Sequence, residues 1–146
     1  LTATMGKGVY LIKPNLRELE GLSGDPVRND TQLAETADRM VQEGQSEVIV
    51  VSMGAAGLFA AWQGGSLRLN APTVPIKSRV GAGDSMVAGI VLSLSQGKDL
   101  PDALRYGLAA GSSAVMSPGT ALCNRQDTER LYGCLKGNED ACEEKT

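Results

Sequence analysis

The chain has 146 residues, of which 42% are hydrophobic, and its formal net charge is −3. This composition is typical of a folded globular domain and argues against a disordered chain. The mildly acidic balance provides no basic face, so we expect neither nucleic acid nor an anionic membrane as a partner. No apolar run reaches the roughly 18 residues that a membrane-spanning helix requires.

Histidine is absent from the sequence. Histidine-dependent catalytic triads, two-histidine metal sites and histidine proton shuttles are therefore excluded within these residues. The cysteines, at positions 123, 134 and 142, are an odd number without a paired short spacing. This pattern favours a reducing compartment, the cytoplasm, over a disulfide framework or a zinc site.

The first predicted element is a buried strand over residues 9–13, because its apolar run is continuous rather than alternating. Pro14 ends the strand. Asn15 then opens a short amphipathic helix in which leucines recur at three-residue spacing. Glu18 follows one turn later. The pair either forms a capping box or offers oxygen ligands at the end of the strand, and the sequence leaves both readings open.

A strand, a helix and a second strand follow one another in this first half. The helix is predicted over residues 30–43 and the second buried strand over residues 47–53. This order implies a right-handed crossover between parallel strands. Ligands of such sheets bind beyond the carboxyl ends of the strands, which is where Asn15, Ser52 and Gly54 fall.

The next segment contains a hairpin and a long apolar helix. The hairpin pairs residues 58–62 with residues 66–69 around Gly64-Gly65. An extended segment over residues 73–80 leads into a helix over residues 83–96, which is unusually apolar and is therefore expected to be buried.

Two further helices are predicted near the C-terminal end. The first begins at Asp99 and Pro101, and its small residues would allow close approach by another helix or by a flat ring. The second is short and runs from Asp127 to Leu135. Residues 137–146 are expected to form a disordered, charged tail.

The turn Gly81-Ala82-Gly83-Asp84 stands at the predicted start of the long apolar helix. Glycines allow backbone N–H groups to approach an anion, and a helix N-terminus attracts negative charge, so the turn is a candidate phosphate cradle beside a carboxylate. The same residues could equally cap a helix. The sequence contains no P-loop motif, and the turn lacks the third glycine of a dinucleotide-binding fingerprint.

Several segments in order resemble the ribokinase-like (PfkB) carbohydrate kinases: residues 13–18, 50–57, 80–86 and 109–114, followed by Gly119-Thr120. The resemblance covers about residues 9–136 and is strongest to the phosphofructokinase branch, especially the type 2 6-phosphofructokinases. It implies an α/β fold with three layers, in which a mainly parallel sheet carries helices on both faces.

The resemblance implies ATP-dependent phosphorylation of a sugar phosphate, with fructose 6-phosphate as the first candidate substrate. 1-Phosphofructokinase and tagatose-6-phosphate kinase are the close alternatives. A non-catalytic nucleotide-binding regulatory module and a hydrolase acting on a phosphate ester are alternatives of other classes. Relatives build the sugar site and its lid from their N-terminal half. We therefore expect residues 1–146 to be the C-terminal nucleotide-binding portion of a longer homodimeric kinase, and to have little activity alone.

The resemblance also implies roles for individual residues. Asp84 would be the general base, and Gly81, Ala82 and Gly83 would form the anion hole for the transferred phosphoryl group. Asn15 and Glu18 would hold Mg²⁺ through water. The expected ATP-lining residues are Lys13, Asn15, Ser52, Met53, Gly54, Gly57, Leu108 and Ser112. Backbone carbonyls for a monovalent cation such as K⁺ would come from Ser78, Val80, Ala114, Ser117 and Gly119.

The sequence departs from the family pattern directly before the glycine turn and again after residue 116. Arg79 stands where the family usually has threonine or serine, and Ser117-Pro118 replaces an asparagine-containing pair. The first departure thus replaces a small hydroxyl side chain by a positively charged one.

Overall fold

A computed structural model describes residues 8–137, so most of the predicted C-terminal tail lies outside the described residues. The chain divides into two compact units, residues 1–69 and residues 70–146. No helix among residues 8–137 is both long and apolar enough to cross a membrane.

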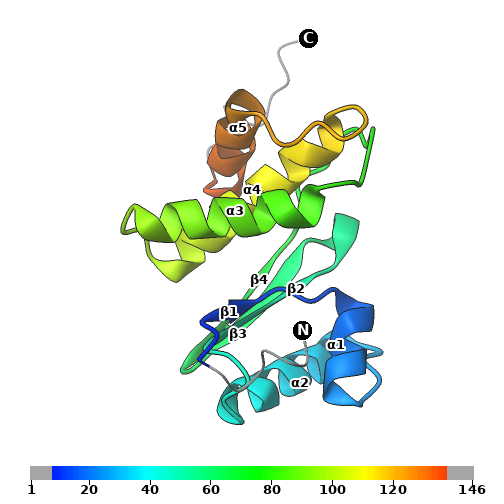
Figure 1. The fold of residues 1–146 in the computed structure, drawn as a ribbon, viewed down its shortest axis with the longest axis vertical. Coiled ribbons are helices and arrows are strands. Elements are labelled where there is room, and N and C mark those ends of the chain that lie inside the picture. The colour runs from blue at the N-terminus through cyan, green and yellow to red at the C-terminus, as the bar shows by residue number, and fades with distance from the viewer. Residues whose placement is uncertain (1–7, 138–146) are drawn as a thin grey trace. The chain divides into compact units, whose positions relative to one another are not determined.

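The first unit is an α/β unit with a four-stranded sheet (Figure 1). Its elements in chain order are β1 (Leu11–Ile12), α1 (Leu16–Ser23), α2 (Asp30–Gln42), β2 (Val48–Ser52), a short 3₁₀ turn (Gly54–Ala56), β3 (Leu58–Trp62) and β4 (Gly65–Leu69). Both predicted helices and the predicted hairpin are confirmed within one or two residues.

The sheet has the strand order β1-β2-β3-β4. Strands β1 and β2 are parallel, as predicted, whereas β2–β3 and β3–β4 are antiparallel. The sheet within the described residues is therefore mixed, where a mainly parallel sheet was expected. The turn over Gly54–Ala56 reverses the chain directly after β2, so β3 returns beside it. Strand β1 is also shorter than the predicted residues 9–13, although Pro14 C=O still accepts from Ser52 N–H at 2.9 Å.

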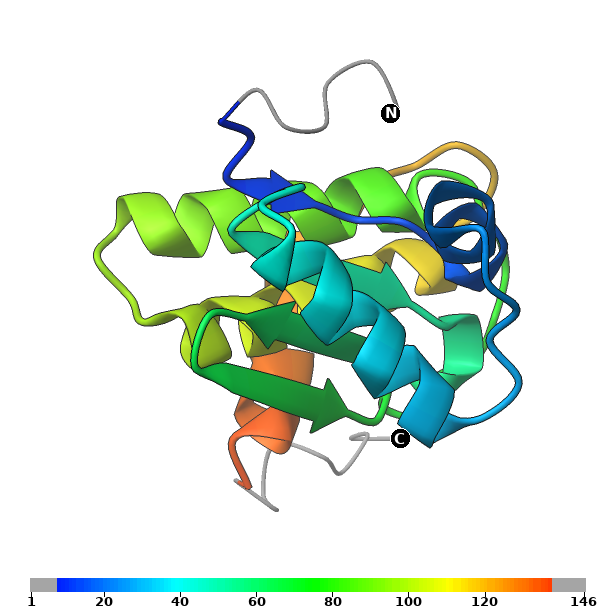
Figure 2. The same ribbon diagram turned by 90° about the horizontal axis from the view of Figure 1, so that it is seen from below.

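Helices α1 and α2 cover the same face of this sheet, and Figure 2 shows α2 lying across the strands. The apolar side chains that form this core are Ile12, Leu19, Leu33, Ala37, Met40, Ile49, Val51, Phe59 and Ala61. Strand β2 is buried along residues 48–51, none of which is more than 2% exposed. This burial agrees with the continuous apolar run in the sequence.

The second unit consists of three helices, α3 (Ala82–Ser95), α4 (Leu100–Met116) and α5 (Arg125–Leu135). Helices α3 and α4 approach closely at glycines. A Cβ atom added at Gly107 would lie 2.3 Å from Ile90 Cγ1, and one added at Gly89 would lie 3.0 Å from the Gly107 Cα. The small residues of α4 therefore serve close helix packing.

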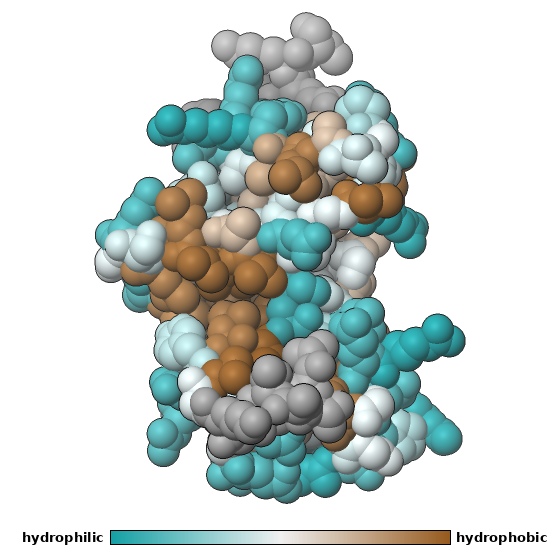
Figure 3. All heavy atoms as spheres, in the orientation of Figure 1, coloured by the Kyte–Doolittle hydropathy of each residue, from teal (hydrophilic) through white to brown (hydrophobic). Residues whose placement is uncertain are grey.

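Helix α3 was expected to be buried, and it has one buried face and one exposed apolar face. Val91 is 57% exposed and Leu92 is 48% exposed, and Figure 3 shows apolar surface over this helix. The side chains that face α4 are buried, including Met86 and Ile90.

A polar and aromatic cluster joins α5 to α4. Tyr132 donates a hydrogen bond to Asp102 Oδ2 at 2.6 Å, and Lys98 Nζ lies 4.5 Å from the Tyr132 ring centroid. The Tyr106 and Tyr132 rings meet edge to face, with centroids 5.2 Å apart. The hydrogen bond from Tyr132 lowers the pKa of Asp102. Burial, and then the same hydrogen bond, raises the pKa of Tyr132.

The contact between α3 and α4 leads to a stability prediction. Gly107→Ala places a Cβ 2.3 Å from Ile90 Cγ1 and 2.8 Å from Met86 C=O, so the helices must separate. We expect the free energy of unfolding, measured with urea, to fall by about 1–3 kcal/mol. Gly21→Ala in α1 is the matched control, because nothing lies within 4 Å of the added methyl group. An equal change in both variants would contradict close packing at Gly107.

The hydrogen bond between Tyr132 and Asp102 leads to a pH-dependent prediction. Tyr132→Phe should lower the free energy of unfolding at pH 7 by about 1–3 kcal/mol. The hydrogen bond lowers the folded-state pKa of Asp102 from 3.8, so its contribution is present above pH 3.8 and is lost as the pH falls through the lowered pKa. Urea unfolding should therefore show the difference between wild type and variant shrinking below pH 3.8.

The matched control for this variant is Tyr10→Phe. Tyr10 is 46% exposed, and no hydrogen bond of its hydroxyl occurs within residues 8–137. The contrary outcome is a difference in free energy of unfolding between wild type and Tyr132→Phe that stays constant from pH 7 to below pH 3.8. That result would show that the hydrogen bond does not act through the Asp102 carboxylate.

Candidate active site

Helix α3 begins without a side-chain cap. Its N-cap residue is Gly81, which adopts a left-handed conformation with φ of 77°, and no side chain accepts from the first turn. The first intrahelical hydrogen bond runs from Ser85 N–H to Gly81 C=O at 2.9 Å. The N–H groups of Ala82, Gly83 and Asp84 precede this ladder and remain available to an anion.

The other α-helices of residues 8–137 begin differently. Each has an Asn or Asp N-cap whose side chain accepts a backbone N–H at 2.8–2.9 Å: Asn15 in α1, Asn29 in α2, Asp99 in α4 and Asn124 in α5. Such caps satisfy one of the free N–H groups of a helix. By contrast, the free N–H groups at the start of α3 have no side-chain partner within the described residues.

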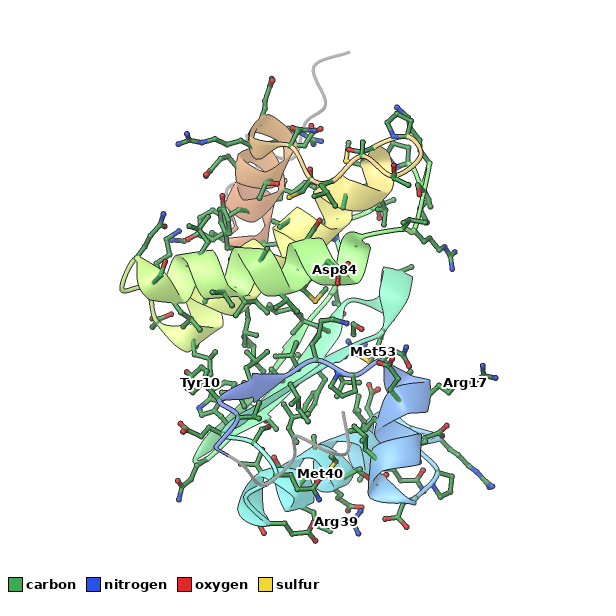
Figure 4. All side chains as sticks on the ribbon, in the orientation of Figure 1. Tyr10, Arg17, Arg39, Met40, Met53 and Asp84 are labelled. Carbon is green, nitrogen blue, oxygen red and sulfur yellow. The ribbon has the colours of Figure 1, made fainter. Side chains whose placement is uncertain are left out.

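The backbone conformation at the position of Gly81 favours glycine. Its φ of 77° disfavours any residue with a Cβ, whereas the nearest atom to an added Cβ, Leu122 Cδ2 at 3.0 Å, ends an exposed side chain that can shift. Figure 4 shows Asp84 in the first turn of the same helix. Asp84 is exposed, and its carboxylate forms no hydrogen bond or ion pair within residues 8–137. The Asp84 carboxylate therefore does not cap α3, whereas Gly81 of the same turn occupies the N-cap position.

The residues expected to bind a monovalent cation lie on two segments that the structure brings together. The N–H groups of Lys77 and Ser78 both donate to Val115 C=O, at 2.8 Å and 3.2 Å. This contact joins the segment of Ser78 and Val80 to the end of α4. The other three expected residues, Ala114, Ser117 and Gly119, lie at the end of α4 and directly after it. Ala114 C=O already accepts a hydrogen bond from Ser117 N–H at 3.1 Å.

A second group of candidate residues lies at the carboxyl ends of β1 and β2. Asn15 and Ser52 form an isolated parallel bridge, and Lys13 Nζ donates to Ser52 Oγ at 3.2 Å. Lys13 is half-buried, and no ion pair involves it within the described residues. The first unit thus brings together three predicted residues from two motifs that are distant in the sequence.

Asn15 and Glu18 form a complete capping box. Glu18 N–H donates to Asn15 Oδ1 at 2.9 Å, and Asn15 N–H donates to Glu18 Oε2 at 2.8 Å. The structural reading of this pair is therefore confirmed. It still leaves Glu18 Oε1 without a hydrogen bond on an exposed side chain, so one carboxylate oxygen fits a water-mediated Mg²⁺ contact. The described residues contain no cluster of three or more acidic or cysteine side chains that could hold a metal directly.

The remaining predicted residues differ in exposure. Gly54 is exposed and Met53 is half-buried, and Met53 N–H donates to Gly57 C=O at 2.8 Å, which holds the turn after β2. Leu108 and Ser112 are buried in α4, at 2% and 7% exposure. The predicted site residues therefore fall into two groups, one in each unit.

Sequence reasoning missed one polar group beside the glycine turn. Ser85 is 4% exposed, and its hydroxyl has no hydrogen-bond partner within the described residues. No sequence signal identifies it, because an unpartnered hydroxyl becomes visible only when the surrounding packing is known.

Comparison with known proteins shows the family to which the chain is related. The model of the pfkB family carbohydrate kinases matches residues 2–127. The ATP-dependent 6-phosphofructokinase isozyme 2 of Mycobacterium tuberculosis is 38% identical over 128 residues, which are 88% of this chain and 38% of that protein. The 1-phosphofructokinase of Borreliella burgdorferi is 32% identical over 84% of this chain and 39% of its own length.

A solved structure has the same fold. The crystal structure of phosphofructokinase-2 from Escherichia coli in complex with potassium superposes with a TM-score of 0.88 and 34% identity, over 92% of this chain and 44% of that chain. The chain thus spans less than half the length of each of these proteins. The predicted ribokinase-like α/β fold is confirmed, and the chain belongs to the pfkB family of carbohydrate kinases.

Proposed function

We propose that this chain is the C-terminal nucleotide-binding portion of a kinase that transfers phosphate from ATP to a sugar phosphate, with fructose 6-phosphate as the substrate. The observation that carries the proposal is the uncapped N-terminus of α3 with the free carboxylate of Asp84 in its first turn. The likeness to a protein named 6-phosphofructokinase isozyme 2 supports the choice of substrate. The likeness to 1-phosphofructokinase makes fructose 1-phosphate the second candidate.

The first step of the proposed reaction is the binding of the transferred phosphoryl group. Phosphoryl transfer depends mainly on alignment and on stabilisation of negative charge. The N–H groups of Ala82, Gly83 and Asp84 supply fixed donors at the positive end of a helix. Because they have no competing side-chain cap, no internal hydrogen bond has to break before the phosphoryl group binds.

The second step is removal of the proton from the sugar hydroxyl. We assign this step to Asp84, because its carboxylate is exposed and has no partner within the described residues. A carboxylate in this state accepts the hydroxyl proton while the sugar oxygen attacks the terminal phosphorus atom of ATP in line, the bond from that phosphorus to the bridging oxygen breaks, and ADP leaves. Asp84 then returns the proton to solvent.

The first unit is assigned to the nucleotide and its metal. Glu18 and Asn15 would hold Mg²⁺ through water, and the bound ion would neutralise charge on the ATP phosphates. The Lys13 ammonium, which lacks an acidic partner, is assigned to the same phosphates. The nucleotide path in this unit is assigned to Ser52, Met53, Gly54 and Gly57.

The second unit is assigned the adenine border and the monovalent cation. Leu108 and Ser112 would border the adenine, and the backbone carbonyls near Ser78 and Ala114 would bind K⁺.

The remaining part of the proposal concerns the whole protein. The chain covers 38% of the mycobacterial relative, so we assign the sugar site and lid to sequence outside it. We propose a cytoplasmic homodimer as the full-length form. An ATP-coupled assay of the full-length protein across phosphorylated hexoses tests the substrate, and the highest kcat/KM is expected with fructose 6-phosphate. Phosphate released to water instead of to a sugar would identify a hydrolase, and ATP binding without turnover would identify a regulatory module.

The role of Asp84 leads to a kinetic prediction. In the full-length protein, Asp84→Asn should lower kcat by about 10²–10⁴-fold, because the amide cannot accept the hydroxyl proton. The ATP dissociation constant should change much less. Asp30→Asn is the matched control, because Asp30 also lies in the first turn of a helix, α2. Near-normal turnover of Asp84→Asn would refute the role of Asp84 as base.

A further inference from the structure

The turn after β2 carries three of the residues assigned to the nucleotide path, Met53, Gly54 and Gly57. Gly54 and Gly57 have positive φ angles of 56° and 94°, which side chains with a Cβ rarely adopt. The turn is closed by its own backbone, because Gly57 N–H donates to Gly54 C=O at 3.0 Å and Met53 N–H donates to Gly57 C=O at 2.8 Å. Residues 54–56 are exposed, so few side chains pack on the turn to hold it.

Arg68 reaches this turn from β4, the last strand of the sheet. Arg68 lies opposite Phe59 in the β3–β4 pair, so it stands beside the start of β3. Its Nη1 atom donates to Ala56 C=O at 3.0 Å and to Leu58 C=O at 3.3 Å. These two carbonyls lie on either side of Gly57. One guanidinium group therefore holds both ends of the segment that leaves the turn.

The charge of Arg68 is not neutralised by an acidic side chain. None of the ion pairs within residues 8–137 involves it, and the two carbonyls are the acceptors of its side chain there. A carbonyl oxygen carries partial negative charge, so carbonyls beside a nucleotide path would repel the phosphates of ATP. A guanidinium donor on both oxygens offsets this repulsion.

Resting on the proposed function, we propose that Arg68 is a positioning residue for ATP, because it fixes the Met53–Gly57 turn in its binding conformation. A turn with two glycines has more conformational freedom to lose than other segments, and without the guanidinium contact ATP binding would have to supply this ordering. Arg68 has no contact with Asp84 among its hydrogen bonds. Its effect therefore falls on nucleotide binding and not on the chemical step.

Steady-state kinetics of the full-length protein test this role. Arg68→Met removes the donors and keeps most of the side-chain length, and it should raise the KM for ATP about three- to tenfold, as expected for exposed charged hydrogen bonds. The kcat and the KM for fructose 6-phosphate should change less than about twofold. Arg68→Lys, which keeps a charged donor, should recover part of the loss. Arg28→Met is the matched control, because Arg28 is exposed and has no ion pair within the described residues.

Amide hydrogen exchange of the nucleotide-free full-length protein tests the contact without catalysis. Arg68→Met should speed exchange in the peptide that contains residues 53–57, because the turn opens more often without the guanidinium contact. Exchange within β2 should stay as in the wild type, and Arg28→Met should change neither segment.

The outcomes separate this role from simpler ones and from the proposed function. A charged residue on the last strand of a sheet also discourages pairing with another chain. That role alone would leave the KM for ATP unchanged in Arg68→Met, and an unchanged KM would overturn the proposal. A fall in kcat, or equal rises in KM for ATP and for the sugar phosphate, would indicate general damage and overturn it too. These results leave the kinase proposal intact, whereas absence of ATP turnover in the wild type would overturn the proposed function and the role of Arg68 with it.

Discussion

Backbone N–H groups at the start of a helix require a hydrogen-bond acceptor. At the start of α3, no side chain within the described residues accepts from these N–H groups. The other α-helices of the described residues meet this requirement with an Asn or Asp cap. Gly81 begins α3 instead, with a left-handed backbone and no side chain to turn inward. A phosphate oxygen is the acceptor that best fits these donors, because the helix dipole adds to the hydrogen bonds.

Close packing of α3 on α4 holds the first turn of α3 in place. A Cβ added at Gly111 would lie 3.1 Å from Ala82 C=O, so the backbone at the start of α3 rests against α4. Val115 at the end of α4 accepts the N–H groups of the segment that leads into the turn. Both sides of the glycine turn are thus attached to one helix. A rigid attachment of this kind keeps donors aligned for a reaction that depends on position.

The sequence predicted the helices well because their caps and apolar periodicity are local signals. The Asn15–Glu18 pair was predicted as a possible capping box and is one. The mixed sheet was harder to predict, because the antiparallel return of β3 beside β2 depends on the fold around the short turn after β2. The exposure of Val91 also could not be predicted, because an apolar helix looks the same in sequence whether or not every face is covered.

The candidate site could be predicted as a set of residues but only partly as a geometry. Motif order and family resemblance singled out Asp84 and the glycine turn as candidates, whereas the absence of a side-chain cap at α3 and the unpartnered hydroxyl of Ser85 required coordinates. The pairing of Lys13 with Ser52 likewise depends on two strands that are distant in sequence. Sequence thus identifies which residue types are present, and packing decides which of their polar atoms are free.

The central claim is that the N-terminus of α3 binds the terminal phosphate of ATP. A crystal structure of the full-length protein with Mg²⁺ and a non-hydrolysable ATP analogue tests it most directly. The account predicts terminal phosphate oxygens at about 2.7–3.2 Å from the backbone nitrogens of the Gly81–Asp84 turn. A terminal phosphate bound elsewhere, with these N–H groups facing solvent or a protein side chain, would contradict it.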